Sequence, residues 1–239
     1  MKTVLITGGA KRLGRAMVER FANDGWRVLF TAQWSFKEGI ELAESLGNHV
    51  HCVQTAVSSR RDAAALAGWV AKYSEDLDLL ICNASTFKKI SVADTVPDSF
   101  DKLLASNLTG PYFLAQQCLQ YLAKTGGSIV NISDAHALSG MPNFSAYGAA
   151  KAGLISITKS MALEFAPTIR VNAILPGTLE WPEDEATFPI AIRSAMVDQI
   201  PLQRIGAWND VVQAVQFLDS AKYVTGVCLP VDGGRSAVY

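Results

Sequence analysis

The sequence lacks an excess of charge of either sign. Its 239 residues carry 21 Lys and Arg against 22 Asp and Glu, a formal net charge of −1, and no basic run of five or more residues occurs. Nucleic acids and anionic membranes are recognised by clustered basic side chains. No stretch approaches the ~18 consecutive apolar residues of a membrane helix either. We therefore expect neither a nucleic-acid partner nor a membrane partner.

Cysteine is also scarce. The four cysteines are scattered and form no C-x-x-C pair, the close spacing that metal and redox motifs require. The first residues, Met1 to Thr7, run directly into glycines and are too short for the apolar core of a signal peptide. These absences predict no metal site, a cytoplasmic location, and free thiols in buried positions.

The composition is typical of one large folded domain. Apolar residues make up 49% of the chain and charged residues 18%, which excludes a disordered chain. No repeat or linker divides the chain, so we expect a single domain over residues 1–239 with an exposed excursion at about 177–200. The prolines and acidic residues of Gly177–Pro189 mark this excursion, which we interpret as a mobile lid.

Short apolar runs alternate with longer amphipathic stretches, and such continuously apolar runs are typical of strands covered on both faces. The predicted strands are Thr3–Thr7, Arg27–Ala32, His49–Gln54, Leu77–Cys82, Ser128–Ile132, Arg170–Ile174 and Cys228–Val231. The predicted helices are Leu13–Asn23, Lys37–Leu46, Arg61–Tyr73, Phe100–Ala123, Ala146–Phe165 and Asp210–Leu218. This alternation predicts an α/β fold, a single doubly wound (Rossmann-type) domain with a parallel sheet of about seven strands and helices on both faces.

A glycine-rich turn, Thr7–Gly14, follows the first predicted strand and opens the first predicted helix. Glycine lets the backbone approach a pyrophosphate closely, and the N-terminus of the helix offers free N–H groups. Its place at the end of the first strand favours a dinucleotide site over a tight turn without a ligand. The residues that we expect to bind the cofactor here are Gly8, Lys11, Arg12, Leu13 and Gly14.

The end of the second predicted strand indicates which dinucleotide binds. NAD-binding sheets usually place Asp or Glu there to hold the ribose 2′-hydroxyl. Thr31–Ser35 contains no carboxylate that would repel a 2′-phosphate, Lys11 and Arg12 add positive charge, and Ser35 can donate a hydrogen bond. This pattern favours NADP(H), and the alternative is that Lys11 and Arg12 form a solvated surface pair.

Tyr147 and Lys151 are spaced i, i+4 in a predicted helix and so share one face. A nearby ammonium stabilises a phenolate and lowers the pKa of the phenol toward working pH, which makes Tyr147 a candidate general acid. Lys151 can also hold ribose hydroxyls. The alternative is an aromatic ring and a lysine on an ordinary helix.

Chain order, strand pattern and motifs together resemble the short-chain dehydrogenase/reductase family over essentially the whole chain. The matching features are Thr7-Gly8 to Gly14, Asn83-Ala84, Asn107, Tyr147 to Lys151, and Pro176-Gly177. The resemblance implies a catalytic set of Asn107, residue 134, Tyr147 and Lys151. The cofactor contacts that it implies come from Asn83, Ala84, Ser133, Tyr147, Lys151, Pro176, Gly177, Thr178 and Leu179. It also implies a homotetramer in which the helices Phe100–Ala123 and Ala146–Phe165 pair between subunits.

The sequence departs from the usual family pattern at three points that resemble one branch, the pteridine reductases. Arg12 replaces the second glycine of the phosphate turn, Ser85 follows Asn83-Ala84 in place of glycine, and Asp134 occupies the position of the catalytic serine. The segment Leu179–Glu183 is similar to bacterial members of that branch. A further departure is Ala56, where many family members carry an aspartate that hydrogen-bonds the adenine.

Asp134 bears on the choice of substrate. Ketone reduction builds negative charge on oxygen, which a hydroxyl donor stabilises and an ionised carboxylate repels. Reduction of a C=N bond in a pterin ring instead requires a proton on nitrogen, and the aminopyrimidine offers N–H donors to a carboxylate. Burial would raise the pKa of Asp134 and Lys151 would oppose that, with no clear winner from sequence. The alternative for Asp134 is a loop-capping role.

These residues predict an NADPH-dependent reductase of a pterin or folate. Phe87 is expected to stack on the flat ring, and the full substrate-binding set is Arg12, Ser85, Phe87, Asp134, Tyr147 and Trp181. His136 follows Asp134 closely and its role stays open, because a loop histidine is more often structural. The alternatives are a carbonyl (oxoacyl-type) reductase of the same family and a non-catalytic NADP(H) sensor.

Overall fold

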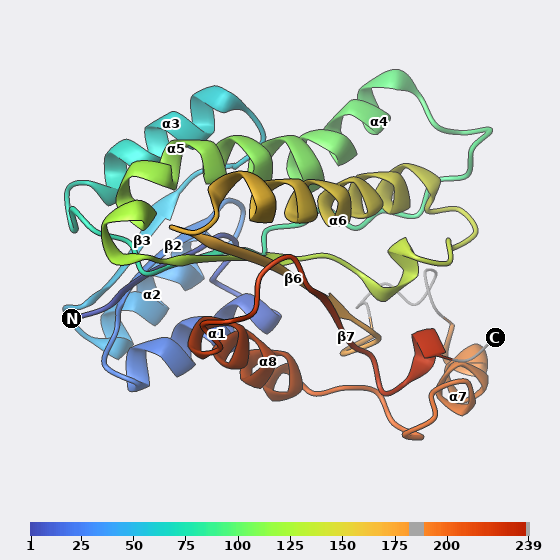
Figure 1. Cartoon of the computed structure of the whole chain (residues 1–239). Helices are drawn as coiled ribbons and strands as arrows, with labels where there is room; N and C mark the ends of the chain where they lie inside the picture. The colour runs from blue at the N-terminus through green and yellow to red at the C-terminus, as the bar shows by residue number, and fades with distance from the viewer. Residues whose placement is uncertain (182–188, 238–239) are drawn as a thin grey trace.

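The computed structural model describes residues 1–181 and 189–237. Its strands form one parallel sheet in the order β3-β2-β1-β4-β5-β6-β7 (Figure 1). The strands are β1 (Thr3–Ile6), β2 (Arg27–Ala32), β3 (Val50–Gln54), β4 (Leu79–Cys82), β5 (Ser128–Ile132), β6 (Arg170–Pro176) and β7 (Cys228–Val231). This arrangement confirms the predicted doubly wound parallel sheet.

Helices cover both faces of the sheet (Figure 1). One face carries α1 (Arg12–Asn23), α2 (Phe36–Leu46) and α8 (Trp208–Ser220), and the other carries α3 (Arg60–Val70), α4 (Pro97–Leu104), α5 (Gly110–Thr125) and α6 (Ser145–Phe165). Along β1, Val4 and Ile6 join the apolar cluster under the first face and Leu5 joins the cluster under the second. The alternation of side chains along a strand thus fills two cores from one continuously apolar run.

Two helical regions differ from the sequence prediction. The helix expected over Phe100–Ala123 is present within a continuous helical stretch from Pro97 to Thr125, but a π-helical segment, η1 (Ala105–Thr109), lies between α4 and α5. At Gly110 a Cβ would collide with the carbonyl oxygen of Val57, so the chain comes too close to its neighbour there for any side chain. The other predicted elements are confirmed, with ends that shift by no more than three residues.

A short helix, α7 (Ile190–Asp198), lies within the excursion that was expected to be irregular. None of its side chains is buried, so its sequence carries no strong apolar face to signal a helix. The part of the predicted lid at residues 182–188 lies outside the described residues, and so do residues 238–239.

The order of the strands determines where the open crevice of the fold lies. The chain winds outward from β1 through β2 to β3, then returns to pair β4 on the other side of β1. In such sheets ligands bind outside the carboxyl ends of the strands where the order reverses. The turn after β1 lies there, and it is tight, because a Cβ on Gly14 would collide with the carbonyl oxygen of Gly8.

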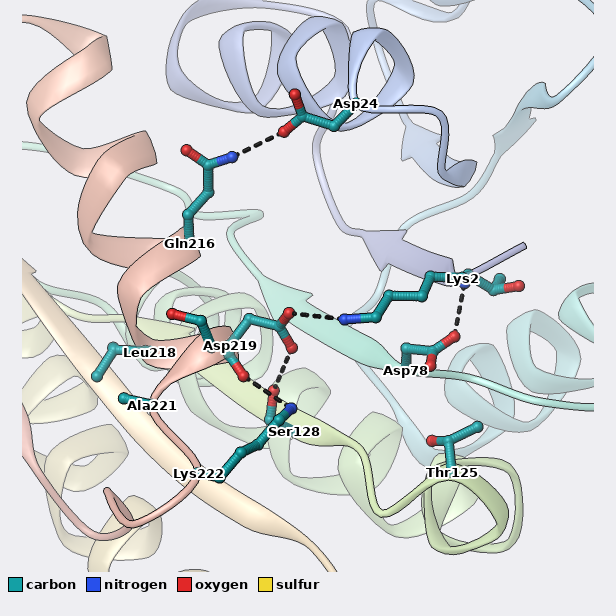
Figure 2. Close-up of polar contacts among 12 residues, drawn as sticks. Lys2, Asp24, Asp78, Thr125, Ser128, Gln216, Leu218, Asp219, Ala221 and Lys222 are labelled. Atoms are coloured by element: carbon teal, nitrogen blue, oxygen red, sulfur yellow. Dashed lines mark hydrogen bonds and ion pairs between the residues drawn. The ribbon is translucent and has the colours of Figure 1, made fainter.

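The opposite, amino end of the sheet is closed by polar contacts (Figure 2). Asp219 of α8 accepts hydrogen bonds from Lys2 Nζ at 3.4 Å and from Ser128 Oγ at 3.3 Å. The guanidinium of Arg170 donates to the carbonyl oxygens of Leu218 at 2.6 Å and of Asp219 at 2.7 Å. These bonds tie the last turn of α8 to the starts of β5 and β6 and satisfy carbonyl groups that a helix end leaves unpaired.

The cysteines are free thiols. Cys82 and Cys118 are buried and Cys52 and Cys228 are half-buried. Burial raises the pKa of the Cys82 thiol to about 12. Over residues 1–181 and 189–237, no helix has the length and apolar character of a membrane span, and no cluster of His, Cys, Asp and Glu could hold a metal ion.

Candidate active site

The N-terminus of α1 points its free backbone N–H groups at the crevice. Lys11, the N-cap residue, makes no side-chain capping bond, and the first turn of α1 contains no acidic residue. A helix start without a cap carries unpaired donors and a partial positive charge. Because Arg12 and Leu13 also line the cavity, this turn fits the pyrophosphate of a dinucleotide.

Asn83, at the end of β4, fixes this turn from the side. Its Nδ2 donates to the carbonyl oxygens of Thr7 at 2.9 Å and Gly8 at 3.1 Å. The hydroxyl of Thr7 in turn accepts from the backbone N–H groups of Asn83 and Ala84, both at 2.9 Å. The Asn83-Ala84 motif therefore locks β1 to β4 at the point where the order of strands reverses.

Arg12 adopts a backbone conformation that usually requires glycine. Its φ is +54°, in the left-handed region, which costs an ordinary residue about 1–2 kcal/mol. Its side chain donates from Nε to Glu180 at 2.7 Å and from Nη2 to the carbonyl oxygen of Trp181 at 3.3 Å. The guanidinium therefore lies on the β6 side of the crevice, and the expectation that it supports a 2′-phosphate near Ser35 is wrong.

The side chain of Lys11 lies on the opposite side of the crevice from that of Arg12, as expected. Its ammonium is 3.0 Å from Glu38 Oε1 at the start of α2, and both side chains are exposed. Ser35 and Trp34 line the same part of the cavity, with Trp34 90% exposed. Sequence reasoning missed Glu38, since nothing in the local pattern of α2 indicates a partner on α1.

Tyr147, Lys151 and Asp134 meet at the centre of the site. The phenol of Tyr147 donates to Asp134 Oδ2 at 2.7 Å. Lys151 is buried, and its Nζ donates to the carbonyl oxygen of Ile132 at 2.8 Å and lies 5.8 Å from the centre of the Tyr147 ring. The helix α6 presents the tyrosine and the lysine on one face, as their spacing predicts, and β5 ends just before the aspartate.

The electrostatics of Tyr147 differ from the sequence expectation. Burial, followed by the charge and the hydrogen bond of Asp134, raises the pKa of the phenol well above its ordinary value. The expectation that Lys151 lowers this pKa is therefore wrong, because Asp134 is closer and opposes it. Tyr147 is held in its protonated form, ready to give its proton.

The pKa values of Lys151 and Asp134 shift in the directions that burial and hydrogen bonding require. Burial lowers the pKa of Lys151 to about 8, against the attraction of Asp134. Burial also acts to raise the pKa of Asp134, but hydrogen bonds from His136 and Tyr147 outweigh it and hold that pKa below its usual value. The sequence left open whether burial or its opposing interactions would determine the pKa of Asp134. Hydrogen-bond donors to the carboxylate outweigh burial and keep Asp134 ionised.

Aromatic rings form one wall of the site. Phe87 stacks on Phe144 with ring centres 4.6 Å apart and meets Tyr147 edge-on at 5.0 Å. Phe87 is 41% exposed and lines the cavity together with Met141. Phe144 and Met141 were missed, because the loop before α6 carries no periodic pattern that would mark them.

These groups surround a cavity of about 830 Å³, within the usual range for small-molecule sites. The predicted residues that line it are Gly8, Lys11, Arg12, Leu13, Gly14, Ser35, Asn83, Ala84, Ser85, Phe87, Ser133, Asp134, Tyr147, Lys151, Pro176, Gly177, Thr178 and Leu179, together with Ala56 and His136. The structure therefore brings nearly all of the predicted site residues together.

Comparisons with known proteins agree with this geometry. A family model described as enoyl-(acyl carrier protein) reductase matches residues 8–236. A short-chain type dehydrogenase/reductase of Sinorhizobium fredii is 37% identical over 99% of this chain, which spans 44% of that relative's length. A 3-oxoacyl-(acyl-carrier-protein) reductase of Thermotoga maritima is 33% identical, with 98% of this chain and 97% of the relative aligned. The chain belongs to the short-chain dehydrogenase/reductase family.

Solved structures support the same assignment. A structure from Sinorhizobium meliloti described as a short-chain alcohol dehydrogenase superposes with a TM-score of 0.92 at 29% identity, covering 100% of this chain and 97% of the other. Members of the short-chain dehydrogenase/reductase family are oxidoreductases that use a nicotinamide cofactor. The uncapped start of α1 and the cavity beside it fit such a cofactor.

Two predicted residues of this short-chain dehydrogenase/reductase do not line the cavity. Asn107 is fully buried in η1, where its Oδ1 accepts from Ser85 Oγ at 2.6 Å and its Nδ2 donates to the carbonyl oxygen of Thr86 at 3.0 Å. Its side chain thus positions Ser85. The ring of Trp181 lies 5.3 Å from the guanidinium carbon of Arg193, so its expected place in the pocket wall is wrong.

Proposed function

We propose that this protein is an NADPH-dependent reductase of pteridines, which reduces a C=N bond of a dihydropterin or dihydrofolate to the tetrahydro form. One observation carries the proposal. The hydroxyl of Tyr147 donates to Asp134, and both side chains line the cavity. A carboxylate thus stands beside the proton donor, at the position where the family resemblance expects a serine.

An ionised Asp134 disfavours carbonyl substrates. An alkoxide formed beside this carboxylate would be repelled, because the cavity wall offers low dielectric and little screening. A ring nitrogen that receives a proton builds no such negative charge. The amino and N–H groups of a pterin can in addition donate to the carboxylate, so the same charge that penalises a ketone orients a pterin.

The residues of the site divide the reaction among them. A nicotinamide cofactor would supply the hydride when bound. Tyr147 gives its proton to the ring nitrogen, Asp134 orients the ring, and Lys151 would hold the ribose of the cofactor. Phe87, with Phe144 behind it, offers a flat aromatic surface on which a pterin can stack. Ser85 and Arg12 complete the polar contacts at the edges of the substrate.

The proposed cofactor is NADPH. No carboxylate occurs in Thr31–Ser35, and the ammonium of Lys11 lies on this side of the cavity. Backbone N–H groups at the start of α1 would hold the pyrophosphate. The segment after β6 lines the nicotinamide side of the cavity, and the residues proposed to contact the cofactor there are Pro176, Gly177, Thr178 and Leu179.

A carbonyl reductase is the second candidate. The Thermotoga maritima relative is named a 3-oxoacyl-(acyl-carrier-protein) reductase and aligns with almost the whole chain, which favours this activity. The matching family model is described by a third chemistry, enoyl reduction, so the family alone does not choose a substrate. A sensor without activity is disfavoured because Tyr147 and Lys151 are both present and face the cavity.

The test is a substrate panel with the purified protein. NADPH oxidation is followed with dihydrobiopterin, dihydromonapterin, dihydrofolate and quinonoid pterins, and in parallel with ketones and acetoacetyl thioesters. We expect turnover of at least one pterin and little turnover of ketones. Good turnover of ketones with none of any pterin would replace the proposal by the carbonyl reductase, and binding without any turnover would favour the sensor.

The assembly and location of the protein are part of the same proposal. We propose a single domain over residues 1–239 that forms a homotetramer through the exposed faces of α5 and α6. A mass measured by light scattering equal to the 25.7 kDa of one chain would remove the tetramer. The cytoplasmic location expected from the sequence stays a prediction.

A further inference from the structure

The carboxylate of Asp134 is held at both of its oxygens. Oδ2 accepts the hydrogen bond from the phenol of Tyr147 at 2.7 Å. Oδ1 accepts from the backbone N–H of His136 at 2.8 Å and lies 3.0 Å from Nδ1 of the same histidine. The aspartate therefore bridges the phenol to an imidazole that the sequence left without a role.

His136 lies at the end of this chain of groups that is farthest from Tyr147. It stands in the 3₁₀ turn η2 (Ala135–Ala137), lines the cavity, and has 20% of its side chain exposed, against 18% for Asp134. A carboxylate only accepts hydrogen bonds, so the imidazole donates through Nδ1–H.

We propose that His136 is a positioning residue that controls proton donation by Tyr147 through Asp134. Its Nδ1–H holds Oδ1 so that Oδ2 faces the phenol, and this hydrogen bond draws the charge of the carboxylate away from the phenol. The inference rests on the proposed function, in which Tyr147 gives its proton to the substrate.

The step balances without proton transfer through the histidine. The O–H bond of Tyr147 breaks, the substrate nitrogen gains that proton, and the neighbouring carbon gains the hydride. His136 keeps its proton, and the phenolate takes one from water before the next turnover. A phenolate beside Asp134 alone would place two negative charges together, and a hydrogen-bond donor on the far oxygen reduces that cost.

The other charged groups near His136 come from two elements packed against η2. The helix α6 contributes Tyr147 and Lys151, and η3 (Arg235–Ala237) contributes Arg235. Lys151 is bound to the carbonyl oxygen of Ile132. Arg235 is engaged with the carbonyl oxygen of Met196 at 3.3 Å and with Gln199 Oε1 at 3.0 Å.

The decisive variants are His136→Asn and His136→Phe, because the amide of asparagine can donate to Oδ1 in place of Nδ1 and a phenyl ring cannot. We expect His136→Phe to lower kcat about tenfold while the KM for NADPH stays within about twofold of the wild type, and His136→Asn to recover most of that loss. His51→Asn, on β3 and outside the cavity, is the matched control and should keep the wild-type kcat.

Two outcomes would overturn the proposal. A His136→Phe variant with the wild-type kcat would show that the ring does not position the carboxylate. A His136→Asn variant as impaired as His136→Phe would show that the hydrogen bond to Oδ1 plays no part. The kinetics are measured with whichever substrate the panel shows to be turned over, pterin or ketone.

A readout that needs no substrate separates this inference from the proposed function. In a crystal structure of His136→Phe, the distance from Asp134 Oδ2 to the phenol of Tyr147 should exceed the 2.7 Å of the wild type, and in His136→Asn it should be kept. An unchanged distance in His136→Phe would refute the positioning role, whereas absence of pterin turnover with a lengthened distance would refute only the substrate.

Discussion

The two ends of the same sheet use similar polar residues for different purposes. At the amino end, Lys2 and Ser128 bind the carboxylate of Asp219 (Figure 2). Arg170 binds the backbone carbonyl oxygen of the same residue. At the carboxyl end, Tyr147 and His136 bind Asp134. Both sets hold an aspartate between donors, yet only the second set lines the cavity of about 830 Å³.

The two ends differ in whether their polar groups also face a cavity. At the amino end, the guanidinium of Arg170 donates to carbonyl oxygens of α8, and its buried Nε has no partner among the described residues. At the carboxyl end, the groups are bonded to one another but also face space that a substrate can enter. Polar groups that are closed off stabilise the fold, whereas those left facing a cavity are available for chemistry.

The largest expected effect is at the carboxyl end. Tyr147→Phe keeps the ring against Phe87 but removes the only proton that we assign to the reaction. Turnover should fall by a factor of about 10²–10⁴, the usual contribution of a general acid. The melting temperature should change little, since the ring keeps its contacts with Phe87 and Phe144. Turnover within a factor of about two of the wild type would remove Tyr147 as the proton donor.

The second effect is at the amino end and concerns stability. Arg170→Met keeps an apolar stem but leaves carbonyl oxygens at the end of α8 without their donors. We expect the free energy of unfolding to fall by about 2–4 kcal/mol in urea denaturation, with unchanged turnover per folded molecule.

Arg15→Met is the matched control for this variant. Its exposed i, i+4 pair with Glu19 spans 2.7 Å, and its loss should cost no more than about 0.5 kcal/mol. Equal losses in the two variants would contradict the structural role assigned to the amino end.

A third effect links the active site to stability through pH. Burial lowers the pKa of Lys151 from 10.5 to about 8, so between these values the unfolded chain binds more protons than the folded one. Stability should therefore rise with pH across this window, as the folded protein ceases to bury an ammonium. The free energy of unfolding of the wild type minus that of Lys151→Met, measured by denaturation, should therefore increase between these pH values. A constant difference would contradict the buried ammonium.

The smallest effect concerns the cofactor. Glu38→Gln frees Lys11 from its exposed ion pair. The KM for NADPH should therefore fall a few fold, which corresponds to roughly the free energy of one surface ion pair. Lys11→Ala should raise the KM for NADPH by a similar factor and leave the KM for NADH unchanged. Equal shifts for both cofactors would show that Lys11 does not recognise the 2′-phosphate.

Local sequence was sufficient for most of the fold. Runs such as Leu77–Cys82 and Ser128–Ile132 are continuously apolar, and only a parallel sheet with two covered faces accommodates them. The glycine turn and the Tyr147–Lys151 spacing could also be located, because each is a short pattern with a fixed geometry.

The remainder depended on contacts between distant segments. The π-helical turn at Ala105–Thr109 lies next to the point where Gly110 meets Val57, and the partners Glu38 and Glu180 lie on other elements than the basic residues that they bind. The raised pKa of Tyr147 likewise required the 2.7 Å distance to Asp134, which no sequence pattern contains. Pairings of this kind follow from the fold rather than from the local chain.

The central claim is that Asp134, in the place of a hydroxyl, selects a nitrogen heterocycle over a ketone. The most direct test compares kcat/KM for 7,8-dihydropterin and for a ketone in the wild type and in Asp134→Ser. We predict that the wild type prefers the pterin by about 100-fold or more and that the serine variant loses most of that preference while gaining ketone turnover. A wild type that prefers the ketone, or a serine variant whose preference for the pterin is undiminished, would contradict the account.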